Sequence, residues 1–111
     1  MAQNRITRGV AAVGALAVNT GTTVKNIKYG SASLDAASIN GGETGTVTTT
    51  ITGAATGDIV IVNPPALTTG LAYAGAAITS ANTLTIYLVN ATANPINNAA
   101  ATFRWVWIDL T

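Results

Sequence analysis

The chain has 111 residues, contains neither cysteine nor histidine, and carries a formal net charge of +1 with only 8% charged residues. The lack of cysteine excludes disulfides and thiolate metal sites, and the lack of histidine removes the commonest general base and metal ligand. Hydrophobic residues make up 49% of the sequence. Disorder requires low hydrophobicity together with high net charge, so this chain is expected to fold. Its sparsely charged surface gives little protection against association, which favours a protein that works in contact with others.

Residues 1–22 differ in composition from the rest and are predicted to form an extended N-terminal arm. They are rich in Ala and Gly and show no two-residue alternation, and Gly14 weakens the alternative of a short helix over residues 10–18. Four of the five basic residues fall within the first 28 positions, whereas the remainder has four acids and one base. This asymmetry suggests that the arm seeks an acidic partner. Four charges over 28 residues are too sparse for nucleic-acid binding.

The same segment also has features of a secretory leader. Arg5 and Arg8 precede the apolar run GVAAVGALAV at residues 9–18. The run is shorter than the 20 or so residues that a transmembrane helix needs. A secreted surface or adhesin domain would have this leader removed. We expect instead that the segment is retained and held in place by a partner.

Two-residue alternation and Gly, Asn and Pro punctuation predict strands along the rest of the chain. Gly41 and Gly42 mark a turn, and Asn63 followed by Pro64 and Pro65 ends a strand. Many short strands at regular spacing predict an all-β fold, an antiparallel β-sandwich of about seven strands over residues 23–111, with a barrel as the alternative. The predicted strands cover residues 22–30, 31–35, 44–52, 57–62, 70–79, 82–90 and 102–110.

The alternation also predicts which side chains face the core. The stretch at 57–62, GDIVIV, is apolar on both faces, which is typical of a strand covered on both sides. The stretches at 44–52 and 82–90 alternate clearly between apolar and polar residues or between two distinct faces. Val47, Thr49 and Ile51 share one face of the first, and Leu84, Ile86 and Leu88 are the predicted inward residues of the second.

Groups that could transfer protons or bind metal are few. Asp35, Glu43, Asp58 and Asp109 are the only acids, and no spacing ties any two of them into a site. A glycosidase needs only two carboxylates, but no nucleophile and base pair is present, so we expect no enzyme and no cofactor. Asp35 and Glu43 lack the dense oxygen ligands of a calcium loop. Asn90 begins a glycosylation sequon, which is more simply explained by a strand that turns at this residue.

The last predicted strand, TFRWVWIDL at residues 102–110, has two apolar faces. Its aromatic residues lie on one face, and Val106, Ile108 and Leu110 lie on the other. One face is expected in the core and the other against a partner, the alternative being cover by the arm of the same chain. Trp and Arg are typical interface anchors. The predicted contact residues of this strand are Arg104, Trp105, Val106, Trp107 and Ile108.

Residues 57–110 carry a motif series that resembles a β-sandwich unit of tailed-phage structural proteins. The series is G-D-x-V-x-V-N-P-P-A, then G-L-x-Y, then A-N-T-L-T-I-x-L-x-N, and finally a Thr–aromatic–Arg strand. Similar units occur on heads, tails and fibres. Because the chain is one small domain with an arm and no fibre shaft, it resembles in particular a capsid cement, or decoration, protein.

The resemblance implies a structural virion protein on the outer surface of the capsid. It implies a homotrimer at three-fold positions that bridges major capsid protein subunits, with N-terminal arms taking part and neither nucleic acid nor membrane as a partner. The alternative is a tail, baseplate or fibre-tip protein that takes part in host attachment. The arm residues expected to contact the capsid are Arg5, Ile6, Arg8, Val10, Val13, Leu16 and Val18.

Overall fold

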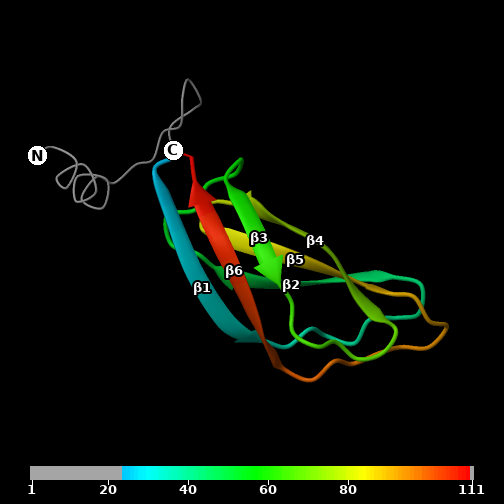
Figure 1. Cartoon of the computed structure of the whole chain (residues 1–111). Coiled ribbons are helices and arrows are strands. Elements are labelled where there is room, and N and C mark those ends of the chain that lie inside the picture. The colour runs from blue at the N-terminus through cyan, green and yellow to red at the C-terminus, as the bar shows by residue number, and fades with distance from the viewer. Residues whose placement is uncertain (1–23, 111) are drawn as a thin grey trace, which may run out of the picture.

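The computed structural model describes residues 24–110, which form six β-strands arranged as a sandwich (Figure 1). The strands are β1 (Asn26–Leu34), β2 (Thr44–Thr50), β3 (Ile59–Asn63), β4 (Leu71–Ser80), β5 (Thr83–Asn90) and β6 (Ala101–Asp109). All pairings are antiparallel, and the two three-stranded sheets have the orders β1-β6-β3 and β2-β5-β4. The predicted all-β sandwich is thereby confirmed, and the strands described do not close into a barrel. The predicted arm lies outside the described residues.

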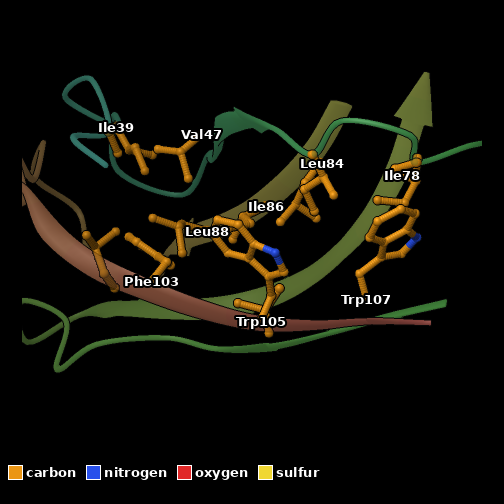
Figure 2. Close-up of a cluster of buried hydrophobic side chains, with 14 residues drawn as sticks. Ile39, Val47, Ile78, Leu84, Ile86, Leu88, Phe103, Trp105 and Trp107 are labelled. Carbon is orange, nitrogen blue, oxygen red and sulfur yellow. The ribbon is translucent and has the colours of Figure 1, made fainter. Parts of the chain in front are cut away.

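The central strands β5 and β6 supply most of the core. Leu84, Ile86 and Leu88 of β5 are completely buried, as the alternation predicted, and the aromatic residues of β6 face them across the sandwich. Figure 2 shows Trp105 pointing toward Ile86 and Leu88. Burial of such large side chains is the main favourable term in folding.

Strand β1 joins two segments that the sequence suggested as separate strands, 22–30 and 31–35. Residues Asn26–Leu34 pair with β6 in one unbroken register. Gly30 does not interrupt the strand; it makes room for an aromatic side chain. A Cβ atom at Gly30 would lie 2.7 Å from both Cε2 and Nε1 of Trp105. The glycine is therefore required by close packing inside the sheet rather than by a turn.

Strand β3 corrects one prediction. The apolar stretch at 57–62 was expected to be covered on both sides, but Ile59 and Ile61 are exposed in the structure, whereas Val62 is buried. The reason is that β3 belongs to a two-layer sandwich, in which the other sheet covers only the inner side of the sheet β1-β6-β3. One of its faces therefore packs on the core and the other faces outward. The strand ends at Asn63, before the two prolines, as predicted.

Buried amides hold together the end of the sandwich where β5 ends. The Asn90 side chain donates to the carbonyl oxygens of Ile39 and Asn94, each at 2.8 Å, and accepts from the backbone N–H and hydroxyl of Thr92 at 2.9 and 2.7 Å. Strand β5 ends at Asn90, whose side chain is completely buried, which confirms the prediction that a strand ends and turns at this residue. Hydrogen bonding of this completeness offsets the cost of burying a polar group.

Among residues 24–110, no helix is long and apolar enough to cross a membrane.

Substitution of Gly30 by Ala tests the packing of Trp105. We expect Gly30→Ala to lower the free energy of unfolding by about 1–3 kcal/mol, because the added methyl overlaps the indole. Denaturant unfolding measures this change. Ser31→Ala, at the exposed neighbouring position, is the matched control and should change stability by no more than about 0.5 kcal/mol. Equal stability of Gly30→Ala and the wild type would contradict the close packing.

Candidate protein-binding face

Two complete rows of apolar side chains cross the sheet β1-β6-β3 on the side that points away from the core. The strand register places Ile27 opposite Ile108, which in turn lies opposite Ile59. The next outward row is formed in the same way, two residues further along each strand. We call these two rows the outer face; they consist of Ile27, Tyr29, Ile59, Ile61, Val106 and Ile108.

The outer face is accessible in the described part of the chain. Ile27 is 57% exposed, Tyr29 67%, Ile59 47% and Ile61 61%, while the two residues of the central strand are partly buried between them. Figure 1 shows β1, β6 and β3 side by side as one layer, with β4 and β5 behind it. Contiguous exposed apolar side chains on a soluble domain mark interaction sites. The outer face is therefore the part of the surface best suited to bind another molecule.

A polar row borders the outer face on one side. The register places Arg104 between Ser31 and Asn63. Where this row meets the apolar ones there is a hollow of about 150 Å³. Its lining residues are Tyr29, Ile61, Asn63, Arg104, Trp105 and Val106. The hollow can accommodate a small apolar group with a hydrogen-bonding partner beside it.

The structure divides the residues of β6 that the sequence singled out. Arg104, Val106 and Ile108 alternate toward the outer side, and Arg104 is exposed. Trp105 and Trp107 point into the core and are only 7% and 4% exposed. These two tryptophans therefore shape the sheet from inside the core. Their predicted contact with a partner protein stays a prediction. The predicted contact residues of the arm, between Arg5 and Val18, lie outside the described residues.

Sequence reasoning missed the four most exposed members of the outer face. Ile27 and Tyr29 alternate on β1, and Ile59 and Ile61 alternate on β3. Each pair is visible in the sequence as an i, i+2 repeat. That the two pairs flank Val106 and Ile108 depends on the strand order, which no local pattern contains.

The acidic residues are separated into two kinds of environment. Asp35 and Glu43 are exposed, whereas Asp58 and Asp109 are buried. The Asp109 carboxylate accepts a hydrogen bond of 3.4 Å from the Asn26 side chain. Among residues 24–110, no group of three potential ligands is arranged to hold a metal ion.

Asp58 closes the end of the sandwich at which β6 ends. Its Oδ2 accepts hydrogen bonds of 3.0 Å from the Trp107 indole N–H and from the Ala55 backbone, and its Oδ1 accepts one of 3.2 Å from the Leu110 backbone. Burial acts to raise the pKa of Asp58, but the three N–H donors act in the opposite direction and outweigh it. The pKa of this carboxyl therefore lies below its usual value. Three donors on one carboxylate indicate a structural role, because each stabilises the ionised form.

The second contact of Trp107 comes from a cation. The ammonium of Lys28 lies 5.6 Å from the centroid of the indole ring, within the range of a cation–π interaction. Trp107 is thus held by Asp58 at its N–H and by Lys28 over its face. These contacts fix the position of β6, the strand that carries the centre of the outer face.

The features described so far define the class of protein as an all-β domain of two packed three-stranded antiparallel sheets with an exposed apolar sheet face. Comparisons of the chain with protein-family models, with curated proteins and with solved structures found no match.

Replacement of Asp58 by Asn tests the buried carboxylate. A carboxyl with a lowered folded pKa adds stability above its unfolded pKa of about 3.9, and this contribution is lost as the pH falls through the folded value. We expect Asp58→Asn to cost about 1–3 kcal/mol near neutral pH, where all three N–H donors lose an anionic acceptor. The difference from the wild type should shrink steadily below about pH 4.

Unfolding free energies of both proteins, measured from neutral pH to pH 2, check this dependence. Asp35→Asn serves as the matched control, since the Asp35 side chain is exposed and its replacement should matter little. A stability difference between wild type and Asp58→Asn that stays constant down to pH 2 would contradict the assignment.

Proposed function

We propose that the protein is a structural virion component, a capsid cement or decoration protein that binds the outer surface of a phage head and bridges major capsid protein subunits. The observation that carries the proposal is the exposed outer face on a rigid sandwich. The resemblance of residues 57–110 to phage structural β-sandwich units supports the location. The protein would act by binding rather than by chemistry.

The geometry suits this mechanism. A sheet face whose backbone is fixed by ladders on both sides of β6 loses little conformational entropy on docking. Burial of the apolar rows supplies about 25 cal/mol per Å² removed from water. Each contact on a shell can be weak, because many copies on a symmetric lattice add through effective concentration. Bridging of adjacent subunits then resists internal pressure.

The arm is assigned a second contact in the same proposal. Its apolar residues, which include Ile6, Val10 and Leu16, would pack into grooves between capsid subunits, while Arg5 and Arg8 meet acidic side chains at the rim. A partner must supply the ordering free energy, since each fixed backbone residue costs roughly 1–2 kcal/mol. By the resemblance, the copies would sit as homotrimers.

One observation favours a second candidate, a tail, baseplate or fibre-tip protein that attaches to a host glycan. The hollow beside the outer face combines the ring of Tyr29 with the polar side chains of Asn63 and Arg104. Aromatic faces and hydrogen-bonding groups together suit sugars. A reconstruction of the intact particle separates the two candidates, because density for this chain would lie on the head in one and on the tail in the other.

The outer face is tested by removing its most exposed apolar groups. We expect Tyr29→Ser/Ile61→Ser to weaken binding to phage heads that lack the protein by roughly tenfold or more, since two large apolar contacts are lost. Thr46→Ser/Thr48→Ser, on exposed positions of β2 in the other sheet, is the matched control and should bind like the wild type. Pelleting with heads measures both. Binding of Tyr29→Ser/Ile61→Ser that equals that of the wild type would contradict the proposal that the outer face contacts the capsid.

The arm is tested by its charges. Arg5→Ala/Arg8→Ala should weaken binding to the same heads more at low than at high ionic strength, because exposed charge pairs are screened by salt. Titrations at two salt concentrations give the comparison. A loss of affinity that is independent of salt would show that the arginines do not meet acidic partners.

A further inference from the structure

We propose that the outer face docks on a protein surface of one particular chemistry, with an apolar centre and carboxylates at its rim. This inference rests on the proposed function, because it names the chemistry of the partner surface that the outer face would meet. It follows from where the charges of the described residues lie.

All three exposed cations of residues 24–110 belong to the sheet that carries the outer face. Lys25 immediately precedes β1, and Arg104 lies on β6 in the row that borders the outer face. Lys28, within β1, lies opposite Trp107 in the register and over its indole ring, on the core side of the sheet. No acidic side chain lies in the outer face or in its polar border row. Lys25 and Arg104 therefore stand at opposite ends of the apolar rows, and an approaching surface meets positive charge at both ends.

The exposed acids lie elsewhere. Asp35 and Glu43 occur in the connection between β1 and β2, and the two other acids are buried. Interfaces are selected by matching opposite potentials, and like charges brought together are unfavourable. The exposed charge of the domain is thus divided, with two of its three cations, Lys25 and Arg104, on the side of the sheet that carries the outer face.

This division argues against a second copy as the occupant. Two outer faces packed together would oppose cations with cations. The connection that carries Asp35 and Glu43 has exposed acids, but Ala36 and Ile39 are buried and the small Ala37 is its only exposed apolar residue, so it offers no large apolar centre.

It also argues against the N-terminal segment of the same chain. Residues 1–23 contain apolar side chains that could cover the rows. Their only charged residues are Arg5 and Arg8, and they include no acid. Covering the outer face with this segment would add positive charge to a positive border. A foreign surface with carboxylates is the occupant that satisfies both the apolar rows and the cations.

The test uses the chain itself as the probe. Lys25→Glu/Arg104→Glu, the reversed-rim variant, keeps the apolar rows but places carboxylates at their ends, which is the surface chemistry proposed for the partner. The two reversals change the net charge from +1 to −3. Full-length wild type and full-length reversed-rim variant are mixed and followed by sedimentation velocity.

Two controls accompany the mixture. Thr44→Glu/Thr46→Glu/Thr48→Glu/Thr50→Glu carries the same net charge of −3 but places its acids on exposed positions of β2, away from the outer face. Tyr29→Ser/Ile61→Ser keeps the cations and lacks two apolar groups. Thermal unfolding confirms that each variant is folded.

We expect wild type and reversed-rim variant to form a complex of the two chains in equal proportion. Its affinity should fall by about two- to fivefold per charge pair when salt is raised to screen them. It should fall roughly tenfold or more with Tyr29→Ser/Ile61→Ser in place of the wild type. The β2 acidic variant should not replace the reversed-rim variant.

Several outcomes would overturn the inference. Absence of the mixed complex, or equal binding of the β2 acidic variant, would show that the outer face does not recognise this chemistry. Self-association of the wild type that Tyr29→Ser/Ile61→Ser abolishes would make a second copy the occupant. Binding to vesicles of anionic lipid without binding to the reversed-rim variant would point to a membrane.

If the wild type binds phage heads but forms no mixed complex, this inference fails and the proposed function stands. If the mixed complex forms but the wild type does not bind phage heads, the proposed function alone is rejected.

Discussion

The two-residue period of β6 is the constraint on which the rest of the structure depends. Because the aromatic side chains at 103, 105 and 107 fill the core, the residues between them must point outward. The two neighbours in the sheet, β1 and β3, are aligned with β6 by continuous ladders, so they present their own alternate residues on the same side. A register shift of one residue would bury Arg104 and expose the tryptophans. The core thus fixes the composition of the surface, and the outer face is a consequence of how the core is built.

The ends of β6 are secured by polar groups with complete sets of partners. Asp58 binds the indole N–H of Trp107 and the backbone of Leu110, while Asn98 accepts from the backbone and hydroxyl of Thr68 at the opposite end. No buried side-chain nitrogen or oxygen of the described residues lacks a hydrogen-bond partner. Buried groups satisfied in this way specify one arrangement of the chain. A domain held like this keeps its sheet face in one shape, which favours recognition by docking.

Local patterns in the sequence were sufficient for the fold class and for the inward face of β5. They showed that β6 has two apolar faces but did not identify which of the two is buried. Alternation at Leu84, Ile86 and Leu88 identified the buried side of a strand directly. The same patterns failed where the answer depends on neighbours. The segments 22–30 and 31–35 were predicted as separate strands, because the close approach of Gly30 to Trp105 is a long-range contact that no local pattern contains. The run at 57–62 was predicted to be covered on both sides, because its composition does not show that one side of its sheet lies open in the described part of the chain.

The central claim is that the outer face is the contact surface of this protein in its assembly. Hydroxyl-radical footprinting of the chain, free and bound to phage heads, tests it residue by residue. The account predicts that Tyr29 and Ile61, which are 67% and 61% exposed in the free domain, lose most of their reactivity on binding. Reactivity of Tyr87 on β5 of the other sheet should stay unchanged. Unchanged labelling of Tyr29 and Ile61 together with protection of the other sheet would contradict the account.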